Sequence, residues 1–416
     1  MDIGSFQVAG DALLRVDEAW DRLARAVLPL GRVDTVALAN ADGRVLAETV
    51  TSAVALPRFD NSAMDGWAVR RRDLSPAGPT LLPQGGRIAA GHSSEGVSAA
   101  GKAVRIFTGA PLPADADLVV MQEDATVEPD GRVRLPALPR RSDNVRRAGE
   151  DVALDAVVLS PGRRLRPQDV ALAAAAGRAT LRVAARLRVA LFSTGDEVRE
   201  PGSPLGPAAI YDSNRVLLHA LLRRAGAEVT DLGILADDRT ALTARLREAA
   251  AGHDLVLTSG GVSAGEEDHV RAAVAAQGAL AFWKLAIKPG RPVALGRVGG
   301  TPFLGLPGNP VAAFIAYAHV GRPLLARLTG EHLSFPGGRP VRAGFRYASP
   351  LGRRDFLRVR LATGADGLEE AVKHPHDGAS SLPSLSDTAG LLVVREDVAD
   401  LAPGAVAPFV SYAELW

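Results

Sequence analysis

The sequence predicts a multidomain protein of the α/β plus β class, with a central doubly wound parallel sheet, a β-rich second domain and a small C-terminal β domain. Its 416 residues exceed the length over which one hydrophobic core keeps growing, so several domains are expected. From Leu187 onward, strand-like and helix-like segments alternate, which is typical of a parallel sheet covered on both faces. Short β-type runs between Gly and Pro turns occupy about 33–159 and recur after Gly330.

The spacing of apolar residues and the turn residues predict the individual elements. Residues 11–28 place apolar side chains at helical spacing, so an amphipathic helix is expected near the start of the chain. A short helix is expected from Pro167 to Ala176, because proline stands near its start and Gly177 follows its end. In the α/β region the expected strands are 188–192, 228–235, 254–259, parts of 280–295, and 303–306, and the expected helices are 213–225, 238–250, 266–277 and 310–328.

Composition and charge exclude several classes of function. The 48 basic and 47 acidic side chains give a net charge of +1, so nucleic acid is not expected as a partner. No cysteine is present, which excludes disulfides, thiolate nucleophiles and cysteine-based metal sites, and leaves only oxygen or imidazole as metal ligands. Residues 1–5 lack the features of a secretion signal, and the longest apolar run, 310–320, is too short to span a bilayer. We therefore expect a cytoplasmic protein without a membrane partner.

Polar clusters follow three of the predicted parallel strands. They are Ser193-Thr194-Gly195-Asp196-Glu197, Thr258-Ser259-Gly260-Gly261 and Leu306-Pro307-Gly308-Asn309-Pro310. Because the carboxyl ends of parallel strands meet at one edge of a sheet, these clusters are expected to hold a phosphorylated ligand together. Asp268, in the first turn of the helix after Gly261, is placed to bind a divalent cation beside a phosphate. The alternative for each cluster is ordinary helix capping.

Basic residues gather in Trp283-Lys284-Leu285-Ala286-Ile287-Lys288-Pro289-Gly290-Arg291. If the segment is a strand followed by a turn, Lys284 and Lys288 share a face, because their spacing is even. Arg291 adds a guanidinium suited to a tetrahedral oxyanion or a phosphate. The alternative is a solvated strand edge protected by lysine. Polar residues are also dense in the β-rich segment, where ordinary turns are the alternative explanation.

Taken together, these motifs resemble those of the molybdopterin molybdenumtransferases, the family that includes bacterial MoeA proteins and the E domain of gephyrin. The resemblance rests on motifs in the family's order: Asp60-Asn61-Ser62-Ala63-Met64-Asp65-Gly66, Thr108-Gly109-Ala110-Pro111, Gly149-Glu150-Asp151, Ser193-Thr194-Gly195-Asp196-Glu197, Asp212-Ser213-Asn214, Ser259-Gly260-Gly261-Val262-Ser263, Ile287-Lys288-Pro289-Gly290, Leu306-Pro307-Gly308-Asn309-Pro310 and Gly352-Arg353-Arg354-Asp355-Phe356-Leu357-Arg358. These motifs extend over nearly the whole chain.

The resemblance implies a homodimer of four-domain subunits. The expected units are a helical and linker domain I (1–53 and 152–186), a β-rich domain II (54–151), an α/β molybdopterin-binding domain III (187–333) and a C-terminal β domain IV (334–416). The implied reaction inserts molybdate into adenylylated molybdopterin and releases AMP, with Mg²⁺ as cofactor. The site would lie between domain III of one subunit and domain II of the other. Transfer partners would be other proteins of molybdenum cofactor biosynthesis.

The resemblance also implies roles for individual residues. The implied catalytic residues are Asp65, Asp151, Glu197, Asp237, Asp268, Lys284 and Lys288, of which Glu197, Asp237 and Asp268 would hold the metal. The implied substrate-binding residues are Ser62, Thr108, Thr194, Ser213, Asn214, Ser259, Gly260, Gly261, Ser263, Pro307, Gly308, Asn309, Arg291, Arg358 and Ser380. This chemistry requires no cysteine, because the dithiolene sulfurs belong to the substrate.

The chain departs from the family pattern at three places. Arg291 stands where a lysine is common, and Ala312 stands where a serine often follows Asn-Pro-Val. A Gln-Gly-Ser pattern is replaced by Asp377-Gly378-Ala379-Ser380, so Ser380 is the expected substitute for a missing hydroxyl. Two alternatives stay open at this point: a molybdopterin adenylyltransferase or amidase-type nucleotide enzyme with a related α/β domain, and a non-catalytic scaffold of the same fold. Whether the oxyanion is molybdate or tungstate is also open.

Overall fold

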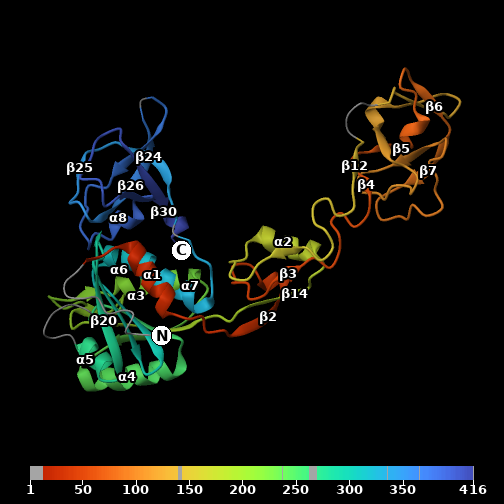
Figure 1. Cartoon of the computed structure of the whole chain (residues 1–416). Helices are drawn as coiled ribbons and strands as arrows, with labels where there is room; N and C mark the ends of the chain where they lie inside the picture. The colour runs from red at the N-terminus through yellow and green to blue at the C-terminus, as the bar shows by residue number, and fades with distance from the viewer. Residues whose placement is uncertain are drawn as a thin grey trace.

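The central unit of the computed structural model is a seven-stranded sheet with helices on both faces (Figure 1). The structure describes residues 13–138, 143–236, 238–261, 269–334, 336–364 and 366–415. The strand order is β1-β20-β22-β23-β19-β15-β18, and β18, β15, β19 and β23 run parallel. β22 runs antiparallel to both of its neighbours, so the sheet is mixed at this side. The predicted doubly wound α/β domain is therefore confirmed, with one reversed strand.

The bounds of this α/β unit agree closely with the expected elements. Its strands are β1 (Leu13–Leu14), β15 (Arg188–Thr194), β18 (Glu228–Leu235), β19 (Leu255–Ser259), β20 (Gly278–Leu285), β22 (Pro292–Val298) and β23 (Thr301–Leu306). Two short strands, β16 (Val198–Arg199) and β17 (Ile210–Tyr211), form a separate parallel pair. Its helices are α1 (Val16–Ala26), α3 (Ser213–Arg224), α4 (Arg239–Gly252), α5 (His269–Ala275), α6 (Pro310–Ala316) and α7 (Arg322–Thr329). A π-helical turn (Tyr317–Gly321) joins α6 to α7, so the predicted helix 310–328 is continuous but wider in its middle.

Alternating side chains of the central strands form two cores. Along β15, Val189 and Leu191 pack with α1, α3, α6 and α7, whereas Ala190 and Phe192 pack with α4 and α5. Figure 1 shows these two helix groups on opposite faces of the sheet. Strands that are buried on both sides are typical of parallel sheets in α/β proteins.

The helix predicted near the start of the chain is α1, and it packs against the α/β unit. Val16, Ala19, Leu23 and Ala26 form its buried face, and Glu18 accepts a hydrogen bond from the backbone N–H of Arg15 at the helix start (3.2 Å). The residues before it form β1, which pairs in parallel with β20. No described helix is long and apolar enough to cross a membrane.

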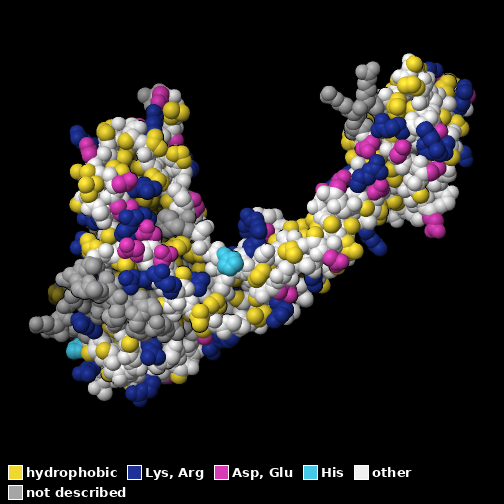
Figure 2. Space-filling view, viewed as in Figure 1, with side chains coloured by type: hydrophobic (Ala, Val, Ile, Leu, Met, Phe, Trp, Pro, Cys, Tyr) yellow, Lys and Arg dark blue, Asp and Glu magenta, His cyan; other side chains and the backbone are white. Residues whose placement is uncertain are grey.

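Two further units extend away from the sheet. A middle unit contains β2 (Val33–Ala37), β3 (Val50–Thr51), β13 (Val157–Leu159), α2 (Pro167–Ala175) and β14 (Thr180–Ala184). A distal β unit contains β4 (Asn61–Ser62), β5 (Gly66–Val69), β6 (Thr80–Leu82), β7 (Gln84–Ile88), β8 (Ala103–Ile106), β9 (Leu118–Met121), β10 (Thr126–Val127), β11 (Val133–Leu135) and β12 (Val145–Arg146). Figures 1 and 2 show the distal β unit at the far end of the narrow middle unit, well away from the α/β unit.

The C-terminal β unit packs beside the α/β unit (Figure 1). Its elements are β21 (Ile287–Lys288), β24 (Arg339–Ala343), β25 (Tyr347–Ala348), β26 (Arg354–Thr363), β27 (Glu369–Lys373), α8 (Pro383–Ser386), β28 (Gly390–Val394), β29 (Asp400–Leu401) and β30 (Val406–Ser411). β21 comes from the α/β segment of the sequence, yet it pairs with β26. The interpretation of 284–288 as one strand is therefore wrong, because the chain changes sheets at Ala286.

A buried ion pair connects the middle unit to the α/β unit. Glu331 is 7% exposed and accepts hydrogen bonds from Arg322 (2.7 and 2.9 Å) and from Arg164 (2.6 and 3.0 Å). Burial acts to raise the pKa of Glu331, but the bonds from the two arginines lower it to about 2. The folded carboxyl therefore stays ionised far below its ordinary pKa of 4.5.

We predict that Glu331→Gln lowers the free energy of unfolding at pH 7 by about 3 kcal/mol, because two guanidiniums then lose their counter-charge. Urea unfolding followed by circular dichroism measures this. A folded pKa below the unfolded one gives stability that is complete above pH 4.5 and lost as the pH falls toward 2. The variant should lack this part of the acid dependence. Glu248→Gln, at an exposed pair with Arg245, is the control, and equal losses in both variants would contradict the prediction.

Candidate functional site

Three strand ends meet at one edge of the sheet, as the sequence predicts. Ser193 of β15 lies opposite Ser259 of β19, and Ser259 lies opposite Leu306 of β23. A cavity of about 310 Å³ opens there. Its wall includes nine of the predicted site residues, namely Thr194, Glu197, Ser213, Asn214, Ser259, Gly260, Gly308, Asn309 and Ser380.

The amide of Asn214 ties these strand ends together. Its Nδ2 donates to Ser259 Oγ (2.8 Å) and to the Gly308 carbonyl (2.6 Å). Ser259 Oγ donates in turn to the Pro307 carbonyl (3.1 Å). Asn214 thus links the start of α3 to the turns that follow β19 and β23.

Glycine is required in the turn after β19. Gly260 and Gly261 have φ angles of +87° and +62°, in the left-handed region that favours glycine. A Cβ on Gly261 would lie 2.6 Å from a methyl group of Val270 and 2.8 Å from one of Thr194. The backbone therefore approaches its neighbours closely at the floor of the site.

Several buried polar atoms around the cavity have no hydrogen-bond partner among the described residues. They are Ser193 Oγ, Thr194 Oγ1 and Asn214 Oδ1, and each of these residues also lines the cavity. Buried polar groups in proteins are nearly always satisfied, so a ligand or water is the expected partner.

Helix capping accounts for only part of the polar clusters. Asp212 accepts from the Arg215 amide (3.0 Å) and Asp238 accepts from the Ala241 amide (2.8 Å), so these two side chains are caps. Asn309 occupies the corresponding position before α6, but its side chain makes no capping hydrogen bond. The capping alternative therefore does not explain Asn309.

A buried arginine supports one wall of the cavity by donating to Asp212, which lines it. Arg215 is 6% exposed, and it donates to Asp212 (2.9 Å), to Asp231 (2.6 Å) and to Glu200. These contacts hold the segment that carries β16 and β17 against α3. The exposed Glu197 lies at this wall, just before β16.

The predicted basic residues lie in different surroundings. Lys284 is exposed on β20, and Arg291 is exposed in the turn after Gly290. Lys288 is half-buried, and its Nζ donates to the Tyr347 hydroxyl (3.3 Å), which donates to the fully buried Asp355 (2.8 Å). Lys284 and Lys288 thus belong to different sheets rather than to one face of one strand.

Arg358 is buried inside the C-terminal β unit. Its guanidinium donates to Ser384 Oγ (3.1 Å) and to the carbonyls of Gly378 (3.2 Å) and His376 (3.4 Å). Arg358 therefore holds the loop that carries Ser380 to the cavity. The Ala379 carbonyl fixes the same loop by accepting from the Val311 amide (3.0 Å).

Asp377, the extra carboxylate of this loop, is compensated locally. Lys373 Nζ donates to it (3.3 Å). Burial acts to raise the pKa of Asp377, but this bond and the positive charges of Lys373, Lys288 and Arg358 lower it. The carboxylate stays charged within a basic cluster.

The distal β unit carries the remaining predicted residues. Asp65 Oδ1 accepts from both the amide and the hydroxyl of Thr108 (2.8 Å each), which lowers the pKa of Asp65. Ser62 is buried, and Asp151 pairs with Arg146, which also donates to Glu150 (2.6 Å). Figure 1 shows this unit far from α3 and α6, whose first residues border the cavity. One subunit therefore does not bring the two groups of residues together.

Three of the predicted site residues, Asp237, Ser263 and Asp268, lie outside the described residues. Two arginines are not among the predicted site residues: Arg146 pairs with Asp151, and the charge of Arg105 acts on Asp65. Arg105 lies on β8, far along the chain from Asp65, so its effect on that carboxylate depends on strand pairing and not on a local sequence pattern.

The described donor set is compatible with a magnesium ion shared with a ligand. Among the described residues, no group of three acidic or histidine side chains is arranged to hold a metal. Mg²⁺ usually takes only one or two carboxylates together with phosphate oxygens. Glu197, at the cavity wall, is the described residue that fits this pattern, and it supplies the oxygen ligand that the ion prefers.

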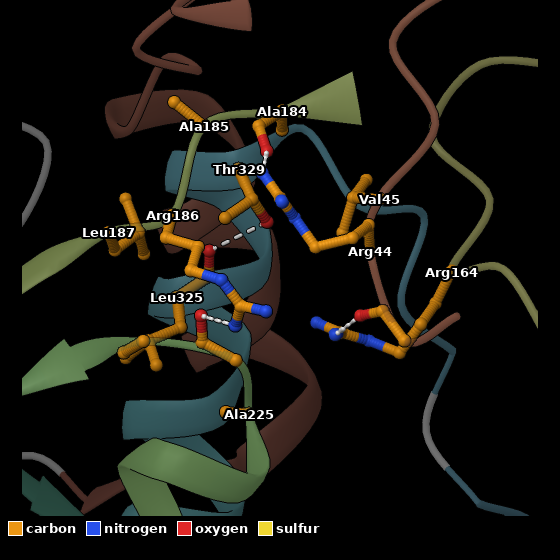
Figure 3. A pocket seen from close by; sticks show the side chains of 13 residues that line it. Arg44, Val45, Arg164, Ala184, Ala185, Arg186, Leu187, Ala225, Leu325 and Thr329 are labelled. Atoms are coloured by element: carbon orange, nitrogen blue, oxygen red, sulfur yellow. Dashed lines mark hydrogen bonds between the residues drawn. The ribbon is translucent and has the colours of Figure 1, made fainter. Parts of the chain in front are cut away.

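A second cavity lies where the middle unit meets the α/β unit (Figure 3). At about 20 Å³ it has room for about one water molecule. Arg44, Arg164 and Arg186 line it and donate to the carbonyls of Ala184 (2.9 Å), Gly43 (2.6 Å) and Gly226 (3.1 Å). These guanidiniums hold the junction together, so this cavity is structural.

We predict that Asn214→Ala lowers the free energy of unfolding by about 2 kcal/mol, because the buried Ser259 hydroxyl and the Gly308 carbonyl lose their donor. Hydrogen-exchange mass spectrometry should show faster exchange in 258–261 and 306–311. Val216→Ala, at an exposed position of the same helix, is the control. Unchanged exchange in both segments would show that Asn214 does not hold them.

Comparisons with known proteins agree with this architecture. Three family models match in order: the MoeA N-terminal region (domains I and II) over 14–177, the probable molybdopterin-binding domain over 190–327, and the MoeA C-terminal region (domain IV) over 340–412. A crystal structure of a molybdopterin biosynthesis MoeA protein from Pyrococcus horikoshii superposes with a TM-score of 0.80 at 27% identity, covering 96% of this chain and 100% of that one.

Curated relatives carry one common name. A molybdopterin molybdenumtransferase of Haemophilus influenzae is 35% identical over 401 residues, covering 95% of this chain and 99% of the relative. Molybdopterin molybdenumtransferase 2 of Mycobacterium tuberculosis is 37% identical over 401 residues, covering 94% and 98%. On the strength of these matches along its whole length, the chain belongs to the molybdopterin molybdenumtransferase family.

Proposed function

We propose that the protein inserts molybdate into adenylylated molybdopterin, releasing AMP and forming the molybdenum cofactor. The observation that carries the proposal is the cavity at the ends of β15, β19 and β23, where three buried polar atoms have no hydrogen-bond partner among the described residues. A pterin has donors and acceptors along its edge, which suits these hydroxyl and amide oxygens.

Basic side chains outside the cavity lining suit the anionic parts of the reaction. Loss of adenylate develops charge on phosphate oxygens, and molybdate is a tetrahedral dianion. Lys284, Lys288 and Arg291 are the cations that we assign to these groups. Arg358 acts chiefly by fixing the loop of Ser380, whose hydroxyl takes the place left by Ala379.

We assign the metal site to Glu197, Asp237 and Asp268, with Mg²⁺ as the ion. When bound, the cation would offset charge on the phosphate oxygens. The protein side of the chemistry belongs to the residues around it, which hold the pterin, orient its phosphate and limit the access of water.

We further propose an elongated homodimer with sites shared between subunits. The distal β unit, which carries Asp65, Thr108 and Asp151, lies far from α3 and α6, whose first residues border the cavity (Figure 1). A second copy in the reverse orientation would bring its distal β unit to this cavity, and two-fold symmetry would create two equal sites. Transfer partners in cofactor biosynthesis and the cytoplasmic location stay predictions.

The two alternatives are weaker. The family models for the regions on both sides of the α/β unit match this chain, and an adenylyltransferase-type enzyme would need only the α/β unit. A scaffold role does not explain the unpartnered polar atoms of the cavity.

We predict that the protein releases AMP from adenylylated molybdopterin only with Mg²⁺ and molybdate present, and that Asp268→Ala abolishes this release. Chromatography of AMP and reconstitution of a cofactor-free molybdoenzyme measure both products. Glu248→Gln, at an exposed acid of α4, is the control. Molybdate-independent release would indicate a hydrolase, tight binding without turnover would indicate a scaffold, and full activity of the variant would remove Asp268 from the mechanism.

Mixing two inactive variants tests the shared site. We predict that Asp65→Asn and Glu197→Gln chains, unfolded and refolded together, regain about a quarter of the wild-type rate, because half of the dimers are mixed and each has one intact site. Each variant refolded alone is the control. No recovery in a verified mixed dimer would place both residues in sites within single chains.

A further inference from the structure

Two arginines lie side by side on one face of the distal β unit. β7 and β8 pair in parallel, with Arg87 directly opposite Arg105. Both guanidiniums lie over the ring of Phe107. The ring centroid is 4.6 Å from Arg87 Cζ and 4.8 Å from Arg105 Cζ. Like charges directly opposite on neighbouring strands destabilise a sheet, so this arrangement is costly without an anion.

Several other arginines of the distal β unit pair with acids, in contrast to Arg87 and Arg105. In the same unit Arg70 pairs with Asp73 (2.6 Å) and Arg132 with Asp130 (2.8 Å), and Arg134, Arg146 and Arg147 also pair with acids. Within the described part of the chain, neither Arg87 nor Arg105 has an ion pair. The polar partners of Arg105 are neutral, namely Gln122 Oε1 (2.5 Å) and the Gly66 carbonyl (3.4 Å).

The pair is accessible and held in place. Arg87 is exposed, while Arg105 and Phe107 are half-buried. Arg105 also lies 5.6 Å from the ring of the buried Trp67, so aromatic contacts restrict its guanidinium. A guanidinium fixed in this way loses little conformational entropy when it binds a ligand.

The position of the pair connects it to the candidate site. Phe107 directly precedes Thr108, which binds Asp65 through two hydrogen bonds. The charge of Arg105 reaches the Asp65 carboxylate and contributes to the lowering of its pKa. The two arginines therefore border the residues that the distal β unit is proposed to bring to the partner's cavity.

We propose that Arg87, Arg105 and Phe107 form a phosphate-binding site for the adenylate end of the substrate. Guanidiniums bind phosphate oxygens through paired N–H donors, and two of them match the charge of a phosphate ester. The identity of the ligand as adenylate rests on the proposed function, whereas the affinity for a phosphate ester does not. Each subunit would hold the nucleotide end of the substrate whose pterin lies in the cavity of its partner.

Calorimetric titration of the full-length protein with AMP, adenosine and sodium molybdate tests the site. We expect Arg87→Gln and Arg105→Gln each to weaken AMP binding about tenfold and to leave adenosine and molybdate binding unchanged. Arg132→Gln, which removes a neutralised arginine of the same unit, should bind AMP as the wild type does. Binding of AMP by the wild type should weaken with salt more steeply than binding by the Arg87 variant.

Results that would overturn the phosphate site differ from results that would overturn the proposed function. Absence of AMP binding by the wild type, or unchanged AMP affinity in the Arg87 variant, would overturn the proposal. Loss of molybdate binding with AMP binding intact would instead assign the pair to the metal oxyanion. Because Arg87 is exposed, Arg87→Gln should fold normally, so it tests the phosphate site even if Arg105→Gln unfolds. A wild type that binds AMP but does not turn over adenylylated molybdopterin would overturn the proposed function and leave the phosphate site standing.

Discussion

The hydrogen bonds from the Asn214 amide to Ser259 and Gly308 hold the candidate site in one piece. They join a helix start to two strand-to-helix turns, so the turns cannot separate without exposing buried polar atoms. The same side chain leaves its Oδ1 without a partner beside Ser193 Oγ and Thr194 Oγ1. Rigid anchoring on one side and unsatisfied acceptors on the other are what a binding site needs, because a ligand then gains hydrogen bonds without ordering the protein.

The two halves of the proposed site differ in the arrangement of their basic side chains. Three of the predicted cations lie on separate elements: Lys284 on a sheet strand, Lys288 in the C-terminal β unit and Arg291 in a turn. In the distal β unit, several arginines pair with acids, whereas the adjacent Arg87 and Arg105 have no ion pair among the described residues. Basic side chains are therefore present on both sides of the proposed subunit contact, which would suit a substrate with several anionic groups.

The departures of the C-terminal β unit from the family pattern are compensated by its packing. Asp377 pairs with Lys373, and the neighbouring carbonyls of Gly378 and His376 accept from the buried Arg358. The loop therefore keeps its position although the family's hydroxyl is replaced by Ala379. Ser380, one residue later, lines the cavity. The net positive charge of this region is smaller than its count of lysines and arginines suggests, because the Asp377 carboxylate lies among them.

The sequence by itself determined the order of strands and helices from 188 to 329, the β character of both flanking units, and the meeting of three polar strand ends. These follow from local periodicity and from the rule that parallel strands end together, and both are properties of short segments. Only the tertiary structure decided that the chain changes sheets at Ala286, which separates Lys284 from Lys288, and that Arg358 is buried among carbonyls. It also decided that Arg87 and Arg105 lie opposite each other. These facts depend on contacts between residues distant in sequence, and the pairing of such residues is set by the packing of whole units rather than by the residues' own pattern.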